Sequence, residues 1–103
     1  MAWIKVGRLS DLADGRGMPF ILGGRRLAIF RVGDDVFAIE NRCPHRGFPL
    51  HDGSLNGLTV RCRTHGSCFD LESGAVVRGP APAGVRTYPV RVDGDGVAVE
   101  VSP

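Results

Sequence analysis

This sequence has few aromatic residues, a small net charge and no long apolar run. Of its 103 residues, 7% are aromatic, and the net charge is +2. The few aromatic residues do not interleave with the arginines as a base-stacking surface requires, so nucleic-acid binding is not expected. No apolar run approaches the roughly 20 residues that cross a bilayer, and the first residues lack the basic head and apolar stretch of a secretion signal. We therefore expect a soluble cytoplasmic protein that binds neither nucleic acid nor membranes.

Cysteine is scarce too, and its placement is informative. The chain has three cysteines, an odd number, and disulfides are disfavoured in a reducing compartment. Metal ligation or catalysis is therefore the better interpretation for at least some of them. All three cysteines and all three histidines fall between positions 43 and 68. Function is expected within residues 41–82, a stretch rich in Cys, His, Gly, Pro and Arg and poor in alternating hydrophobic residues.

Glycine and proline are abundant, at fifteen and seven residues, which favours many turns and short strands. No window of about 11 residues or more carries a convincing helical period. Leu9 to Ala13 is expected to form a single helical turn capped by Ser10. The pattern therefore predicts an all-β fold, and a chain of this length fits one domain with a modest core. The β-type runs predict strands at residues 3–7, 18–22, 25–31, 36–40, 86–92 and 97–101.

Four of the cysteines and histidines form two short clusters, Cys43-Pro44-His45 and Cys62-Arg63-Thr64-His65, separated by residues 46–61. Each cluster pairs one thiolate with one imidazole. An asymmetric 2Fe-2S cluster suits this pattern, because both cysteines can bind one iron and both histidines the other. A Cys2His2 zinc site is the rival, although zinc patterns commonly pair Cys with Cys and His with His. A Cys nucleophile with a His base is the third possibility, and it leaves the second pair unexplained.

The sequence resembles the Rieske ferredoxins over nearly its whole length. Two segments look like the family's cluster-binding loops, and two later ones look like the following hairpin turn and the proline loop. These segments are 43–50 with Gly53 and Gly57, 62–66, 69–74 and 79–82. The resemblance implies an antiparallel β sandwich with a small cluster-binding subdomain made of two loops plus a proline loop. Residues 1–103 would then be a single Rieske 2Fe-2S domain, with the cluster-binding portion at about 41–82. The resemblance also implies one 2Fe-2S cluster per chain, with the ligands Cys43, His45, Cys62 and His65.

Residues beside these ligands are expected to support and tune the cluster. Gly47 and Gly66 each follow a histidine ligand, where the loop must turn sharply, and Pro80 is expected to stiffen the third loop. High-potential relatives carry a serine and a tyrosine at the positions of Ser67 and Phe69. Because one of the two hydroxyls is missing here, the resemblance implies a potential in the lower part of the range from roughly −150 to +300 mV.

Other positions near the clusters carry weaker expectations. Respiratory Rieske proteins have a disulfide between the two loops, and the matching positions here are Phe48 and Thr64, so no disulfide is expected. Cys68 is expected to be a free, buried thiol that packs as a small hydrophobic residue. His51 is expected to be solvated or part of a docking surface, and Asp70 is expected to brace a turn or loop.

The resemblance implies a one-electron carrier that passes electrons from a flavin-dependent reductase to a terminal oxygenase, with no catalytic residues of its own. Two alternatives remain, namely the small Rieske subunit of a nitrite reductase or similar complex, and a zinc-stabilised interaction module. Arginines bracket the ligands, and Arg46 and Arg63 are the docking candidates for acidic redox partners. We expect the chain to be a monomer.

Overall fold

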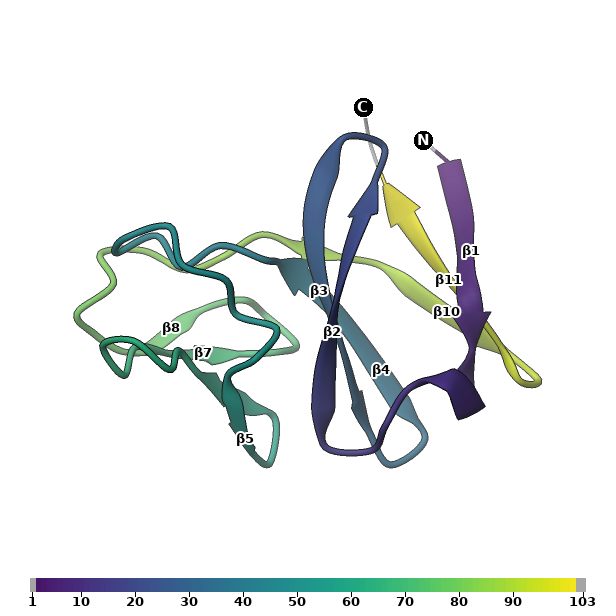
Figure 1. Ribbon diagram of the computed structural model, residues 1–103, viewed down its shortest axis with the longest axis horizontal. Coiled ribbons are helices and arrows are strands. Elements are labelled where there is room, and N and C mark those ends of the chain that lie inside the picture. Colours follow the sequence, from purple (N-terminus) through teal and green to yellow (C-terminus); the bar gives the residue numbers. More distant parts are fainter. Residues whose placement is uncertain (1, 102–103) are drawn as a thin grey trace.

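The computed structural model describes residues 2–101, which form short strands and one turn of 3-10 helix (Figure 1). Within these residues no helix is long and apolar enough to cross a membrane. The 3-10 turn spans Leu9–Asp11. The strands are β1 (Ala2–Arg8), β2 (Arg16–Leu22), β3 (Arg25–Val32), β4 (Asp35–Glu40), β5 (Ser54–Asn56), β6 (Thr59–Arg61), β7 (Cys68–Asp70), β8 (Val76–Arg78), β9 (Thr87–Tyr88), β10 (Val90–Asp93) and β11 (Gly96–Val101).

Two of the three sheets form a sandwich. Their strand orders are β1-β11-β10 and β2-β3-β4-β9, and neighbouring strands are antiparallel. The strand predicted at residues 97–101 is confirmed, and its alternate residues Val97, Val99 and Val101 are buried between the sheets. They pack against Leu27 and Ile29 of β3. The predicted all-β antiparallel sandwich is therefore present.

The third sheet, of order β5-β6-β7-β8, belongs to a second lobe that Figure 1 shows beside the sandwich. We call residues 41–85, which hold this sheet and the loops around it, the loop lobe. Its apolar residues form a second hydrophobic core, together with residues of the sandwich. Leu50, Val60 and Phe69 of the loop lobe cluster with Phe30 of β3 and Ile39 of β4. The loops are thereby held against a rigid support.

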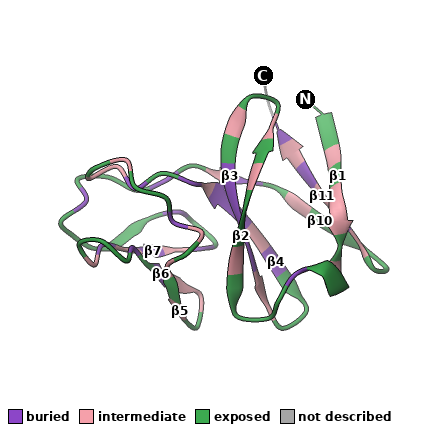
Figure 2. Ribbon diagram, in the orientation of Figure 1, coloured by how far each residue is buried: buried purple, intermediate pink, exposed green. Residues whose placement is uncertain are grey.

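Strand β3 is buried on both faces, which is why one strand can serve two cores. Leu27 and Ile29 face the sandwich core, whereas Ala28 and Phe30 face the core of the loop lobe. All four are fully buried, and Figure 2 shows the buried colour on β3 and on β4 beside it. Successive side chains of a strand point to opposite faces, so a continuous apolar run buries residues on both sides.

The predicted cap of the helical turn is wrong. Ser10 does not cap the turn; its N–H and hydroxyl donate to the Asp95 carboxylate at 3.3 and 3.2 Å, in the turn between β10 and β11. The N-terminal end is instead braced by Asp11, whose Oδ2 accepts from the N–H of Arg8 at 3.0 Å. In a capping box, the side chain at the third helical position accepts from the N–H of the N-cap residue, which is what Asp11 does for Arg8.

The strand predicted at residues 86–92 is two strands in the structure. Tyr88 in β9 pairs with β4 of one sheet, whereas Val90 in β10 pairs with β11 of the other. Pro89 lies between them, and a proline has no N–H to donate to a ladder. The chain therefore leaves one sheet and enters the other at this residue.

Because β3 is buried on both faces, we expect loss of a large β3 side chain to lower the stability of the protein. Phe30→Ala should lower the free energy of unfolding by about 3–5 kcal/mol, because it leaves a cavity between the sandwich and the loop lobe. Denaturant unfolding measures this loss. Ile21→Ala is the matched control, since Ile21 is 75% exposed and should change stability by no more than about 0.5 kcal/mol. If the two substitutions had similar effects on stability, the conclusion that β3 supports both cores would be contradicted.

Candidate metal centre

The two predicted ligand loops have the same backbone hydrogen bonding. In the first loop, the N–H of Cys43 donates to the Phe48 carbonyl at 2.7 Å and the N–H of Gly47 donates to the Cys43 carbonyl at 2.7 Å. In the second loop, the N–H of Cys62 donates to the Ser67 carbonyl at 2.8 Å, and the N–H of Gly66 donates to the Cys62 carbonyl at 3.0 Å. Each loop is thus a compact turn that starts at its cysteine.

Glycine is required in both turns. Gly47 and Gly66 have φ values of +77° and +80°, which lie in the left-handed region that side chains disfavour. An arginine also lies over each glycine, because an added Cβ would lie 3.3 Å from Arg42 Nε and 3.2 Å from Arg61 Nη2. The residue before each cysteine therefore places a guanidinium against its own loop. This repeated arrangement was not predicted from the sequence.

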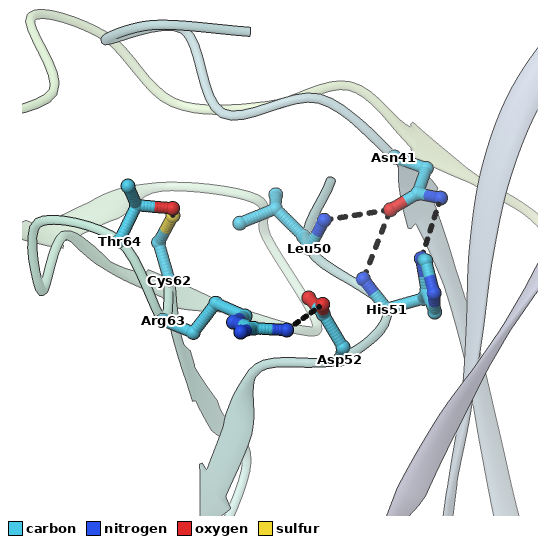
Figure 3. A network of polar contacts seen from close by, with 7 residues as sticks. All are labelled: Asn41, Leu50, His51, Asp52, Cys62, Arg63 and Thr64. Atoms are coloured by element: carbon cyan, nitrogen blue, oxygen red, sulfur yellow. Dashed lines mark hydrogen bonds and ion pairs between the residues drawn. The ribbon is translucent and has the colours of Figure 1, made fainter. Parts of the chain in front are cut away.

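The thiols of Cys43 and Cys62 are brought together in the interior, each residue being 2% exposed. Burial raises the pKa of the Cys43 thiol, a hydrogen bond from the His45 backbone lowers it, the neighbouring Cys62 thiol raises it, and the Ser67 hydroxyl lowers it. Thr64 lies beside Cys62, with 3.8 Å between Sγ and Oγ1 (Figure 3). The two sulfurs are therefore buried neighbours, supported by N–H and O–H groups.

The two imidazoles form the other half of the arrangement. The rings of His45 and His65 lie 4.9 Å apart between centroids at an angle of 86°. His65 is exposed, and the ring of Phe48 lies 6.4 Å from it. The buried Nδ1 of His45 has no hydrogen-bond partner among the described residues. A buried ring nitrogen normally requires a partner, so this atom fits a metal ligand.

The residues thus fit a two-iron cluster by their chemistry. Each loop contributes one thiol to the buried pair and one imidazole to the other pair. Within residues 2–101, no three His, Cys, Asp or Glu side chains are arranged to hold a single metal ion. A 2Fe-2S cluster of the mixed type takes two protein ligands at each iron, which is how these four side chains are divided.

Ser67 connects this centre to the proline loop. The residue is fully buried, and its Oγ accepts a hydrogen bond from the N–H of Ala81 at 3.0 Å. The hydroxyl is also hydrogen bonded to the Cys43 thiol. The Gly79-Pro80 peptide bond is cis, and Pro80 is exposed beside this contact. Ser67 therefore braces the proline loop and contacts a predicted ligand at the same time.

Asn41 is a site residue that the sequence reasoning missed. It is 7% exposed, and its Oδ1 accepts hydrogen bonds from the N–H groups of Leu50 at 2.7 Å and His51 at 2.9 Å. Its Nδ2 contacts His51 Nδ1 at 3.0 Å (Figure 3). His51 is therefore half-buried and hydrogen bonded rather than fully solvated, and its place in a docking surface stays a prediction. The available signal was an asparagine directly after a strand, a position where its side chain can bind nearby backbone groups.

The remaining predicted residues lie around the centre. Arg46 and Arg63 are exposed, and Arg63 Nη1 donates to Asp52 Oδ2 at 3.0 Å (Figure 3). Cys68 is free as expected, but it is half-buried rather than buried, and its thiol donates to the Gly66 carbonyl at 3.5 Å. Cys68 is the first residue of the short strand β7 and directly follows the second loop.

Asp70 braces the turn that follows β7, as predicted. Its Oδ2 accepts hydrogen bonds from the Ser73 hydroxyl at 2.7 Å and from the Ser73 N–H at 2.9 Å. The N–H of Gly74 donates to the Asp70 carbonyl at 2.8 Å, which closes the same turn.

Comparison with known proteins assigns the family. The model of the Rieske [2Fe-2S] domain matches residues 2–89, and the chain belongs to this family. The ferredoxin component of the naphthalene 1,2-dioxygenase system of Pseudomonas putida is 30% identical over 100 residues, covering 97% of this chain and 96% of that protein. The family assignment favours the iron-sulfur cluster over zinc.

Solved structures agree with this assignment. The ferredoxin of carbazole 1,9a-dioxygenase from Nocardioides aromaticivorans superposes with a TM-score of 0.94 at 32% identity, covering 99% of this chain and all of that one. A protein from Mycobacterium tuberculosis, assigned as the small subunit of an NADH-dependent nitrite reductase, gives a TM-score of 0.89 at 26% identity, with 99% and 97% covered. The fold is therefore that of Rieske ferredoxins.

The Ser67 contact predicts a change in reduction potential. Ser67→Ala removes the O–H donor at the Cys43 sulfur, and hydrogen bonds to the sulfurs favour the reduced, more negative cluster. The midpoint potential should fall by several tens of mV, since about 1.4 kcal/mol corresponds to roughly 59 mV for one electron. Spectroelectrochemical titration measures it, with the exposed Ser54→Ala as control. An unchanged potential in Ser67→Ala would remove this hydroxyl from the tuning groups.

The Asp70 turn predicts a pH dependence. The Ser73 hydroxyl and N–H hold the pKa of Asp70 below its ordinary value. The folded state thus favours the charged form, so this contribution to stability is present above the ordinary pKa and is lost as pH falls through the lowered one. Ser73→Ala removes the hydroxyl and should raise the pKa of Asp70 towards its ordinary value, as followed by NMR titration of the carboxyl carbon. Identical titration curves would contradict the bracing role.

Proposed function

We propose that this chain is a one-electron carrier of an oxygenase system, with Cys43 and Cys62 as ligands to one iron and His45 and His65 as ligands to the other. The observation that carries the proposal is the sorting of these side chains into a buried thiol pair and an imidazole pair, with each loop giving one member to each. When bound, the cluster accepts and releases a single electron. The ferredoxin named for the naphthalene dioxygenase system supports the same role.

The chain's own residues divide the tasks of such a carrier. The buried Cys43 and Cys62 exclude water from the sulfur side, and the N–H and O–H groups around them stabilise thiolates. The exposed His65 lies on the opposite side of the centre, where a partner can approach within a short distance. We propose that electrons enter and leave through this side.

Partners and location follow from the same proposal. A flavin-dependent reductase would supply electrons, and a terminal oxygenase would receive them. All four proposed ligands come from one chain, which supports a monomer and a single Rieske domain over residues 1–103, with the cluster-binding portion at 41–82. Cys68, which is not a proposed ligand, is a free thiol, which suits the reducing cytoplasm.

A second candidate function is the small subunit of a nitrite reductase complex. The likeness to the Mycobacterium tuberculosis structure favours it, because that likeness extends over the whole of both chains. Gel filtration with each candidate partner distinguishes the two. A permanent complex with a large reductase subunit would favour the second candidate, whereas transient turnover with an oxygenase would favour the first.

The ligand set can be tested against a matched control in the same chain. Cys43→Ser and His45→Ala should abolish or rearrange the visible absorption and the EPR signal of the reduced cluster. Cys68→Ser should retain both, because Cys68 bonds to the Gly66 carbonyl rather than to the thiol pair. A colourless protein that contains zinc and no acid-labile sulfide would contradict the electron-carrier proposal.

Docking is proposed to use the exposed arginines beside the centre. Arg46 has no charged partner among residues 2–101, whereas Arg63 is bonded to Asp52. Arg63 is nevertheless 70% exposed, and an exposed ion pair of this kind contributes little and is screened by salt. Arg46 is therefore the freer positive charge for an acidic partner.

The docking proposal predicts a dependence on salt. Arg46→Gln should slow reduction by a flavin-dependent reductase by about 2–5-fold at low ionic strength, and the difference should disappear at about 0.5 M NaCl. Arg63→Gln should have a smaller effect because Asp52 already offsets its charge. Stopped-flow absorbance measures the rates, and Lys5→Gln on β1 is the control for charge alone. Rates that do not respond to ionic strength would contradict docking by these arginines.

A further inference from the structure

The two proposed ligand loops are closed at their bases in different ways. The second loop, residues 62–67, lies between β6 and β7, which are neighbours in one ladder, so that Arg61 pairs with Cys68 and Val60 with Phe69. The first loop begins after β4 and ends before β5, and these strands belong to different sheets. No ladder joins the two ends of the first loop, so other contacts must hold its base.

The side chain of Asn41 supplies these contacts. Asn41 directly follows β4, and its Oδ1 accepts hydrogen bonds from the backbone of Leu50 and His51, near the other end of the connection between β4 and β5 (Figure 3). The N–H of Asn41 donates to the Arg26 carbonyl of β3 at 3.0 Å, so Asn41 is itself fixed to the sandwich. One buried amide therefore joins both ends of the first loop to β3.

The ring of His51 supplies the partner for the nitrogen of this amide. Two N–H donors can be met only by the oxygen of Asn41, so its NH2 group must point towards His51. This contact, at 3.0 Å, requires His51 Nδ1 to act as an acceptor, which is the tautomer with its proton on Nε2. His51 thus satisfies the amide nitrogen, which would otherwise have to find another partner within the protein.

Strand β2 supports His51 from the other side. A Cβ at Gly17 would lie 2.6 Å from the His51 carbonyl oxygen and 2.5 Å from Cε1 of Phe30. The backbone of β2 therefore packs directly against the end of the loop. The backbone of His51 thus packs against this strand, and its ring is hydrogen bonded to Asn41.

We propose that Asn41 and His51 form a clasp that positions the first ligand loop, so that Cys43 and His45 are held in register with Cys62 and His65. Both are positioning residues, since Asn41 acts through the backbone of the loop and His51 acts through the Asn41 amide. The proposal rests on the ligand set given under the proposed function. It assigns to a buried polar pair the task that a strand ladder performs for the second loop.

The first test removes the clasp and follows the amides that it binds. In Asn41→Ala, hydrogen exchange of the Leu50 and His51 amides should become about tenfold faster or more, because each loses its acceptor. Peptides from β3 should exchange as in the wild type. Asn56→Ala is the matched control, because Asn56 is exposed at the end of β5. Unchanged exchange at Leu50 and His51 would overturn the clasp.

The second test asks whether the clasp positions the ligands or only stabilises the loop. The EPR line of the reduced protein should broaden or shift in Asn41→Ala, and loss of the visible spectrum to EDTA should be about tenfold faster. An unchanged EPR line and rate of loss, alongside faster exchange, would overturn the positioning role. A wild-type protein with no Rieske signal would instead show that the proposed function itself has failed.

A pair of His51 variants keeps the proposal testable if Asn41→Ala does not fold. His51→Gln retains an acceptor for the Asn41 amide and should keep the wild-type EPR line and rate of loss. His51→Leu removes the acceptor and should reproduce the changes expected of Asn41→Ala. Equal behaviour of His51→Leu and His51→Gln would overturn the role of His51.

Discussion

Strand β3 is apolar on both faces, and two hydrophobic cores are built on it. Antiparallel strands are commonly covered on one face and solvated on the other, but the four consecutive residues from Leu27 to Phe30 are all fully buried. The sandwich core packs on one side of this wall and the loop lobe on the other. Close-packed interiors transmit displacement rather than absorb it. The position of the ligand loops is therefore set by the sandwich, although the sandwich contributes none of the proposed ligands.

The loops show how one local design can depend on different supports. Cys43 and Cys62 begin turns with the same hydrogen bonds, and each turn has an arginine over a left-handed glycine. The second turn ends in paired strands, whereas the first turn ends at a buried amide. A buried polar group stabilises a structure only when its donors and acceptors are all matched. Both polar atoms of the Asn41 side chain have partners, because the oxygen binds two backbone groups and the nitrogen binds one imidazole, which ties the first loop to a few specific atoms.

Local patterns in the sequence predicted those parts of the fold that depend on neighbouring residues. The strands predicted at residues 18–22, 25–31 and 97–101 are indicated by runs of adjacent residues, and the spacing of the cysteines and histidines is itself local. Ser10 was misjudged because its partner lies 85 residues away. The strands β5 to β8 have three residues each, too few to display a period. Asn41 was missed for a related reason, since a single asparagine carries no pattern and its role appears only when the loop has closed.

The arginines that looked like one basic group in the sequence have at least two environments. Arg42 and Arg61 lie against the glycines of the two turns, so their charges belong to the loops themselves. A positive charge near a redox centre favours the reduced form, and the effect is larger where water is excluded. Arg46 and Arg63 lie in solvent, and Arg63 is partly offset by Asp52. Charges of this second kind act mainly on the encounter with a partner. All four arginines are exposed, so the contacts of each guanidinium decide its environment: Arg42 and Arg61 lie against the two turns, whereas Arg46 has no charged partner among residues 2–101.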